Sequence, residues 1–186
     1  IAGARQDDRF ELVAVYSRKQ ETADAFAAKH QIPYTFTSLE EMAKSPLIDA
    51  VYIASPNFLH AEQSILCMKH GKHVLCEKSI TLNIAELDEA VSLAKENNVI
   101  LAEAMTIYHM PVYKKLNEII ASGQLGRLNL IQVNFGSYKD YNMTNRFFSR
   151  KLAGGALLDI GVYSLSLIRW FFKETPTQVS SQVKYA

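Results

Sequence analysis

Two pairs of side chains in this sequence have the residue types and the spacing of a catalytic site. Glu77 and Lys78 stand next to each other directly after an apolar run at residues 73–76. Because desolvation disfavours the charge of a lysine, a lysine at such a position needs a partner or a chemical task. Asp159 and Tyr163 are four residues apart in an apolar stretch, which places them on one helix face. A lone Glu-Lys pair is weak support for acid–base work. For the second pair, a core helix whose tyrosine hydroxyl bonds Asp159 or a backbone carbonyl is the favoured alternative on this segment alone.

A polar turn also follows the apolar run at residues 12–16, where Ser17 and Arg18 stand. In open α/β sheets, ligands bind beyond the carboxyl ends of the strands. An acidic residue at the end of the second strand of a dinucleotide fold holds the ribose of NAD, whereas an arginine accommodates the 2′-phosphate of NADP. Ser17 and Arg18 therefore favour NADP, with a solvated helix-entry arginine as the alternative interpretation.

A third polar turn, Ser55-Pro56-Asn57, follows residues 49–54, and His60 comes one helical turn later. Proline ends a strand because it lacks a backbone N–H, and asparagine is a preferred N-cap residue. The following helix N-terminus is then available to a phosphate or a ribose. A plain strand-to-helix turn and a core histidine are the alternative interpretations.

These turns lie on an alternating pattern of expected strands and helices in the first hundred residues. The predicted strands are residues 12–16, 49–54, 73–77 and 99–102, and the predicted helices are residues 21–30, 59–70 and 84–94. Asn83 and Glu86 resemble a capping box at the start of the third helix. Alternation of this kind predicts an α/β fold, a parallel Rossmann-type sheet with helices on both faces.

The pattern changes near residue 104, which predicts one domain over residues 1–104 and a second over residues 105–186. The second domain is expected to be α+β with a mainly antiparallel, incomplete sheet. Its predicted strands are residues 128–135 and 178–185, its helices are residues 111–122 and 154–172, and residues 139–150 form a loop.

Composition excludes several classes of protein. The 186 residues carry 20 Lys and Arg against 19 Asp and Glu, and this balance argues against nucleic acid or an anionic membrane as the main partner. The most apolar stretch, residues 157–172, is interrupted by Asp159 and Arg169, so no membrane span is expected. Two cysteines without a disulfide framework indicate a cytoplasmic protein. No cluster of His, Cys and carboxylates has the spacing of a metal site.

Taken together, these motifs resemble the Gfo/Idh/MocA family, NAD(P)-dependent oxidoreductases of sugars, inositols and related diols. Residues 71–78 (GKHVLCEK) are close to its most distinctive signature, residues 154–163 (GGALLDIGVY) match its second-domain helix, and residues 55–60 match its nucleotide-side turn. Tyr163 makes the chain similar to the glucose–fructose oxidoreductase and dihydrodiol dehydrogenase subgroup, whereas inositol-dehydrogenase-like members carry His there.

The sequence departs from the family pattern in two respects. The third signature residue is usually proline, and Ser79 in its place predicts a less rigid loop. The family's first βα unit, with its glycine-rich turn, would precede Ile1, and further second-domain strands would follow Ala186. The chain thus resembles the middle half of a family member and, as such a piece, is expected to be inactive by itself.

The resemblance implies hydride transfer between a nicotinamide cofactor, NADP or else NAD, and a CH–OH group of a sugar, polyol or diol. It implies Tyr163 as general base, Lys78 as the cation favouring its phenolate, and Asp159 as orienting the substrate or Lys78. The implied cofactor-binding residues are Ser17, Arg18, Ser55, Pro56, Asn57, His60, Glu77 and Lys78, and the implied substrate-binding residues are Tyr108, His109 and Arg146.

The resemblance also implies a homodimer or homotetramer. A non-catalytic Rossmann-type sensor, which binds cofactor or sugar without turnover, is the alternative function. Retention of both Lys78 and Tyr163 favours the enzyme, because loss of either would have favoured the sensor.

Overall fold

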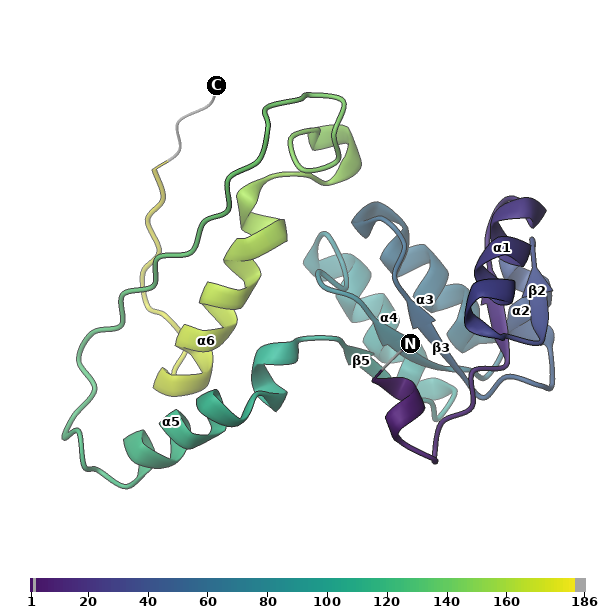
Figure 1. Ribbon diagram of the computed structural model, residues 1–186. Coiled ribbons are helices and arrows are strands. Elements are labelled where there is room, and N and C mark those ends of the chain that lie inside the picture. Colours follow the sequence, from purple (N-terminus) through teal and green to yellow (C-terminus); the bar gives the residue numbers. More distant parts are fainter. Residues whose placement is uncertain (2, 183–186) are drawn as a thin grey trace. The chain divides into compact units, whose positions relative to one another are not determined.

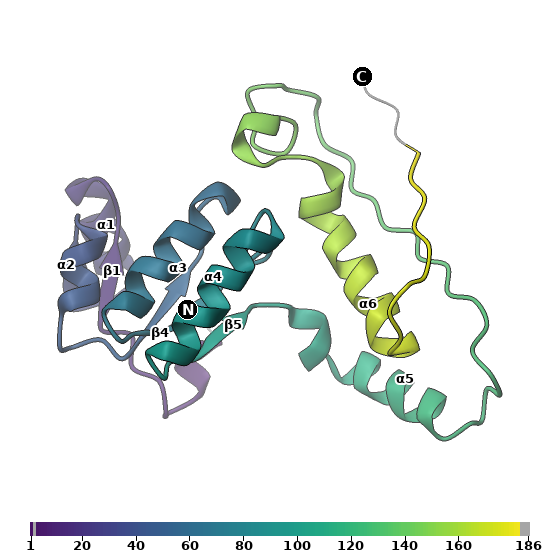
Figure 2. The same ribbon diagram turned by 180° about the vertical axis from the view of Figure 1, so that it is seen from behind.

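The computed structural model describes residues 1 and 3–182, in two compact units, Ile1–Ala104 and Met105–Ala186 (Figures 1 and 2). After a short 3₁₀ helix at Ala4–Gln6, the first unit alternates strands and helices. These are β1 (Ala14–Tyr16), α1 (Gln20–His30), β2 (Tyr34–Phe36), α2 (Leu39–Lys44), β3 (Ala50–Ile53), α3 (His60–Lys69), β4 (His73–Cys76), α4 (Ile84–Glu96) and β5 (Leu101–Glu103).

The strands of the first unit form two parallel sheets. β1 pairs with β2, and β3, β4 and β5 pair in that order, with Ile53 opposite Cys76. Among the described residues, no strand joins β1 to β3. Every strand pair is parallel, as the alternation of strands and helices predicts.

Helices α3 and α4 cover one face of the three-stranded sheet, as Figure 2 shows. Val51 and Ile53 of β3 and Val74 and Cys76 of β4 are buried there, in one core cluster with residues of α3 and α4. Every second residue points the other way, and Tyr52 remains 58% exposed. The expectation of helices on both faces is wrong for this sheet. The connections from β3 to β4 and from β4 to β5 run in the same direction across the sheet, through α3 and α4. Because both crossovers are right-handed, both helices lie on the same face.

The start of α4 confirms the capping box. Asn83 Oδ1 accepts a hydrogen bond from the Glu86 N–H at 3.0 Å, and Glu86 Oε2 accepts one from the Leu82 N–H at 2.9 Å. The first bond satisfies a backbone donor that the helix itself leaves without a partner, and the second holds the N–H of the residue before the N-cap.

Two elements of the first unit were not predicted from the sequence, β2 and α2. A three-residue strand is too short to show a period of two, and α2 spans less than two turns. The available signal was at the start of α2, where the Ser38 side chain accepts a hydrogen bond from the Glu41 N–H at 3.2 Å.

The second unit is helical in its described residues. It contains 3₁₀ helices at Thr106–His109 and Arg150–Leu152, α5 (Pro111–Ala121), a π-helical segment at Leu157–Gly161, and α6 (Val162–Phe172). The expected antiparallel sheet is not formed, because residues 128–135 and 178–182 carry no strand. An alternating segment needs a paired neighbour for its backbone groups, and neither segment has one among the described residues. Residues 183–185 of the second predicted strand lie outside the described residues.

The glycines before the π-helical segment receive the backbone of the preceding loop. The Gly154 N–H donates to the Ser149 carbonyl at 3.0 Å, and the Gly155 N–H donates to the Phe147 carbonyl at 2.9 Å. A Cβ at residue 154 would lie 2.3 Å from the Arg146 carbonyl oxygen. Glycine at these positions therefore allows the backbone of the preceding loop to pack closely against the start of the π-helical segment.

The stretch Arg150–Phe172 is long and apolar enough to cross a membrane by length and composition. A single stretch of this kind is weak support for a span, because the core helix of a soluble protein meets the same criteria. Asp159 and Arg169 lie within it, and charged residues are costly in a bilayer.

Candidate functional site

The carboxyl edge of the three-stranded sheet brings two of the predicted turns together. Because β3 and β4 are parallel neighbours, the turn at Ser55 and the turn at Glu77 and Lys78 leave the sheet at the same edge. The Glu77 N–H still donates to the Ile53 carbonyl at 2.8 Å, so the two turns start from a common hydrogen bond.

The Glu77 carboxylate is held by a tyrosine on the open face of the sheet. The Tyr52 hydroxyl donates a hydrogen bond to Glu77 Oε1, and the Lys78 N–H donates to Glu77 Oε2 at 3.3 Å. Partial burial of the Tyr52 hydroxyl and its hydrogen bond to Glu77 raise the pKa of Tyr52 to about 12. Tyr52 thus stays protonated and keeps its donor over the physiological pH range.

His60, predicted to bind cofactor, is completely buried at the first turn of α3. Its Nδ1 lies 2.7 Å from the Ser79 carbonyl oxygen, and its Nε2 lies 2.8 Å from the Ser55 carbonyl oxygen. Both ring nitrogens therefore face the protein backbone.

The loop that carries Lys78 is anchored from several sides. Ser79 is only 5% exposed, and the Ile80 N–H donates to Glu103 Oε1 of β5 at 2.9 Å. Side chains of neighbouring elements hold the loop on both sides of Ser79, and the less rigid loop expected from Ser79 in place of proline stays a prediction. Lys78 itself is half-buried.

The Ser55 turn leads into α3 in a different way from the one predicted. Asn57 does not cap α3. It begins a 3₁₀ helix at Asn57–Leu59, for which Pro56 is the N-cap residue, and α3 follows from His60. The Ser55 hydroxyl is buried and has no hydrogen-bond partner among the described residues. A buried hydroxyl without a partner is costly, so this turn has polar capacity that a bound ribose or phosphate could use.

Ser17 and Arg18 follow β1, as predicted. The Ser17 N–H extends the ladder to the Phe36 carbonyl at 3.0 Å, and the Ser17 hydroxyl accepts from the Lys19 N–H at 3.5 Å. Arg18 is exposed, as a residue that meets a 2′-phosphate must be.

Asp159 and Tyr163 lie in consecutive turns of the second unit. Asp159 is in the π-helical segment, where its N–H donates to the Gly155 carbonyl at 3.2 Å. Tyr163 is in the first turn of α6, is half-buried, and packs edge-on against Phe135 with ring centroids 6.1 Å apart. Helical segments of this π type are frequent at functional sites.

The three predicted substrate residues come from two segments of the second unit, residues 106–109 and the loop that contains Arg146. Tyr108 packs edge-on against Trp170 with centroids 5.1 Å apart, and His109 ends the 3₁₀ helix at Thr106–His109. Arg146 lies over the Phe147 ring at 4.1 Å, and Lys139 lies over the same ring at 3.8 Å. Arg146 and Lys139 thus bring two positive charges to one aromatic ring.

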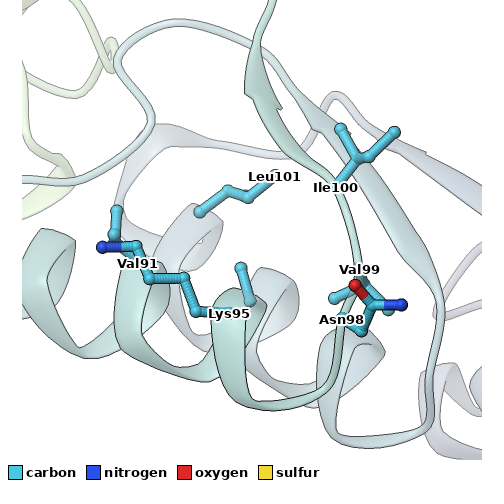
Figure 3. A pocket seen from close by; sticks show the side chains of 7 residues that line it. Val91, Lys95, Asn98, Val99, Ile100 and Leu101 are labelled. Carbon is cyan, nitrogen blue, oxygen red and sulfur yellow. The ribbon is translucent and has the colours of Figure 1, made fainter.

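A cavity of 510 Å³ between the end of α4 and the start of β5 contains none of the predicted residues (Figure 3). It is lined by Val91, Ala94, Lys95, Asn98, Val99, Ile100 and Leu101. It lies at the amino end of β5, opposite the edge that carries Lys78.

The described part of the chain has no group of three or more His, Cys, Asp or Glu that could hold a metal ion. Burial raises the pKa of the Cys67 and Cys76 thiols to about 11, which keeps both protonated.

Comparison with known proteins decides the family. Residues 1–105 match the Gfo/Idh/MocA oxidoreductase family, NAD-binding Rossmann fold, and residues 113–186 match the Gfo/Idh/MocA C-terminal domain. The chain belongs to the Gfo/Idh/MocA family. The resemblance carried by residues 55–60, 71–78 and 154–163 is thereby confirmed.

Curated members of the Gfo/Idh/MocA family are similar over most of this chain. The NADP(+)-dependent scyllo-inositol 2-dehydrogenase of Bacillus subtilis is 43% identical over 169 residues, which cover 89% of this chain and 52% of that protein. The trans-1,2-dihydrobenzene-1,2-diol dehydrogenase of Xenopus tropicalis is 34% identical over 173 residues, which cover 92% of this chain and 52% of that protein. The chain therefore spans about half the length of the curated relatives it matches.

Solved structures of the family show the same fold. The aldose-aldose oxidoreductase of Caulobacter crescentus has a TM-score of 0.77 at 24% identity, covering 89% of this chain and 51% of that one. An NAD-binding oxidoreductase of Klebsiella pneumoniae has a TM-score of 0.74 at 28% identity, covering 87% of this chain and 44% of that one.

Proposed function

We propose that the intact protein carrying this sequence is an NADP-preferring oxidoreductase that acts on a CH–OH group of a sugar, polyol or diol. The observation that carries the proposal is the meeting of two turns at one sheet edge, one with the partnerless Ser55 hydroxyl and the other with Glu77 and Lys78. Ligands of parallel α/β sheets bind at this edge.

The cofactor-binding residues of the proposal lie at the ends of three strands. Ser17 and Arg18 follow β1, Ser55, Pro56 and Asn57 follow β3, and Glu77 and Lys78 follow β4. Arg18 offers a guanidinium to the 2′-phosphate of NADP, and the name of the Bacillus subtilis relative, which includes NADP(+), supports this preference.

Proton transfer in the proposal is assigned to Tyr163. The nicotinamide supplies the hydride chemistry. When the substrate alcohol becomes a carbonyl, Tyr163 receives the hydroxyl proton, and in the reverse direction it returns this proton to the carbonyl oxygen. A tyrosine with an ordinary pKa of ~10 needs a nearby positive charge to act as a base near neutrality, and Lys78 is the proposed source of that charge. Asp159 orients the substrate or Lys78 in this scheme.

Substrate recognition is assigned to Tyr108, His109 and Arg146. The names of the two curated relatives described above support a polyol or diol, an inositol in one case and a dihydrobenzenediol in the other. We also propose a homodimer or homotetramer in the cytoplasm. The two free thiols of the described chain, Cys67 and Cys76, support a reducing compartment.

The proposal is tested by assaying the intact protein with NADP⁺ and NAD⁺ against inositols, sugars and vicinal diols, following reduction of the nicotinamide. Turnover with at least one substrate is expected, with a lower KM for NADP⁺. Tight cofactor binding without turnover on any member of the panel would instead identify a sensor.

The cofactor preference has its own variant. Arg18→Ala is expected to raise the KM for NADP⁺ and to leave the KM for NAD⁺ unchanged, because only NADP⁺ carries the 2′-phosphate. Arg9→Ala is the matched control, since Arg9 is an exposed arginine whose ion pair with Asp7 is also on the surface. Equal losses for both cofactors in Arg18→Ala would refute the role of Arg18.

A further inference from the structure

His60 touches the backbone of both turns that form the candidate site. Ser55 follows β3 and Ser79 follows β4, and the two carbonyl oxygens lie at opposite nitrogens of one buried ring. In the sequence, Ser55 is 5 residues from His60 and Ser79 is 19 residues from His60.

Each ring nitrogen of His60 faces one carbonyl oxygen in these contacts. Carbonyl oxygens only accept, so each hydrogen bond needs a proton on the ring nitrogen that faces it. A neutral imidazole donates from one nitrogen, and the imidazolium ion donates from both. In either form, no ring nitrogen is left to bind a ligand.

Two other anchors hold the Lys78 loop to neighbouring strands of the sheet. Tyr52 binds the Glu77 side chain from β3, and Glu103 binds the Ile80 N–H from β5. His60 acts between these two points, at the carbonyl of Ser79, and joins that carbonyl to the Ser55 turn. The two contacts of the His60 ring therefore set the distance between the Ser55 turn and the loop that carries Lys78.

We infer that His60 is a positioning residue, whose imidazole fixes the spacing between the Ser55 turn and the loop that carries Lys78. The inference deepens the proposed function and rests on it for what the two turns bind, whereas the contacts of the ring stand by themselves. It replaces direct cofactor binding by His60, because a fully buried ring with both nitrogens on carbonyls has no free group to offer a ligand.

The test compares two variants of His60 with a matched histidine control in the intact protein. His60→Leu removes both ring contacts at similar side-chain size, and His60→Gln keeps N–H donors on a single nitrogen, enough for one carbonyl. His73→Gln is the control, because His73 Nδ1 accepts from the Ile100 N–H at 2.9 Å at the opposite end of β4.

Amide hydrogen exchange measured peptide by peptide gives the first readout. In His60→Leu, the rate of amide exchange is expected to rise about tenfold in residues 55–59 and 77–80. A rise of this size corresponds to the loss of about one hydrogen bond. Residues 74–76 within β4 are expected to keep their rate, and His60→Gln to fall in between. His73→Gln is expected to leave both turns unchanged. Unchanged turns in His60→Leu, or an equal rise throughout the first unit, would overturn the inference.

Steady-state kinetics give the second readout. Displacing both turns is expected to raise the KM for NADP⁺ and to lower kcat per folded enzyme in His60→Leu, with partial recovery of both in His60→Gln. A purely structural role would lower the amount of folded enzyme and leave the KM unchanged, which would refute positioning. If the unaltered protein turns over no substrate, the proposed function fails, and hydrogen exchange still decides the role of His60.

Discussion

The Tyr52 hydroxyl donates a hydrogen bond to the Glu77 carboxylate, so a residue on the open face of β3 holds the first residue after β4. This contact places a tyrosine that no sequence motif marks beside the Glu77-Lys78 pair. It also gives Tyr52 a distinctive titration, which can be observed without any knowledge of the substrate.

Replacing Tyr52 by Phe is expected to reduce the loss of stability at alkaline pH. The pKa of Tyr52 is about 12 in the folded protein against an ordinary value of 10.0, so the folded state holds the proton more tightly than the unfolded chain. This contribution to stability is complete below about pH 10 and is lost as the pH rises towards about 12. Urea unfolding across this range, with ultraviolet absorbance to follow tyrosinate formation, measures the difference.

Tyr34→Phe is the control for this titration, because Tyr34 is another exposed tyrosine, on β2. In Tyr34→Phe, the absorbance step near pH 12, which is assigned to Tyr52, is expected to remain. If that step persists in Tyr52→Phe, the hydrogen bond to Glu77 does not control the titration.

Asn83→Ala is expected to destabilise the first unit by about 1 kcal/mol, because it removes the side-chain acceptor of the Glu86 N–H at the start of α4. Asn97→Ala, at the other end of the same helix, is the matched control and is expected to cost less. Urea denaturation followed by circular dichroism compares the two. Equal destabilisation would contradict a specific role of the capping box.

Gly154→Ala is expected to destabilise the second unit by about 1–3 kcal/mol, the usual cost of forcing an added methyl group into a packed position. The added Cβ would meet the Arg146 carbonyl oxygen at 2.3 Å, so backbone must move. Thermal unfolding of the variant measures the loss.

The control for this prediction is Gly136→Ala, where an added Cβ has no neighbour within 4 Å. It is expected to be nearly neutral. A neutral Gly154→Ala would show that the loop at residues 146–149 does not pack against this glycine in solution.

Tyr163→Phe is expected to lower kcat by about 10²-fold or more in the intact protein, since it removes the proposed proton acceptor. The KM for NADP⁺ should stay close to that of the unaltered enzyme. Tyr113→Phe, a half-buried tyrosine of α5 without an assigned role, is the control. Turnover of Tyr163→Phe at the unaltered rate would eliminate Tyr163 as general base.

The order of elements in the first unit was predictable because local signals carry it. Apolar runs marked β3, β4 and β5, and the Asn83 capping box marked the start of α4. The second unit was less predictable, because alternation at residues 128–135 indicates a strand only where a partner strand exists. Local sequence does not show that partner.

For the candidate site, the sequence showed which residues to consider but not what they contact. Glu77 and Lys78 were recognisable beside each other in the chain. Tyr52 lies 25 residues from Glu77, and His60 lies 19 residues from Ser79. Contacts at such separations follow from the parallel pairing of β3 with β4. The sequence therefore suggests that His60, at the start of α3, binds a ligand. Only the three-dimensional structure shows that His60 links the two turns.

The separation of the sheet into two parts affects how these 186 residues behave in solution. β1 and β3 each pair on one side only among the described residues, so each presents a row of backbone donors and acceptors on its other side. Such edges are templates for pairing with another chain, and a net charge of +1 supplies little electrostatic repulsion between molecules. Concentrated preparations of this chain are accordingly expected to aggregate through their main chains, and a strand-forming peptide that occupies both edges would improve solubility.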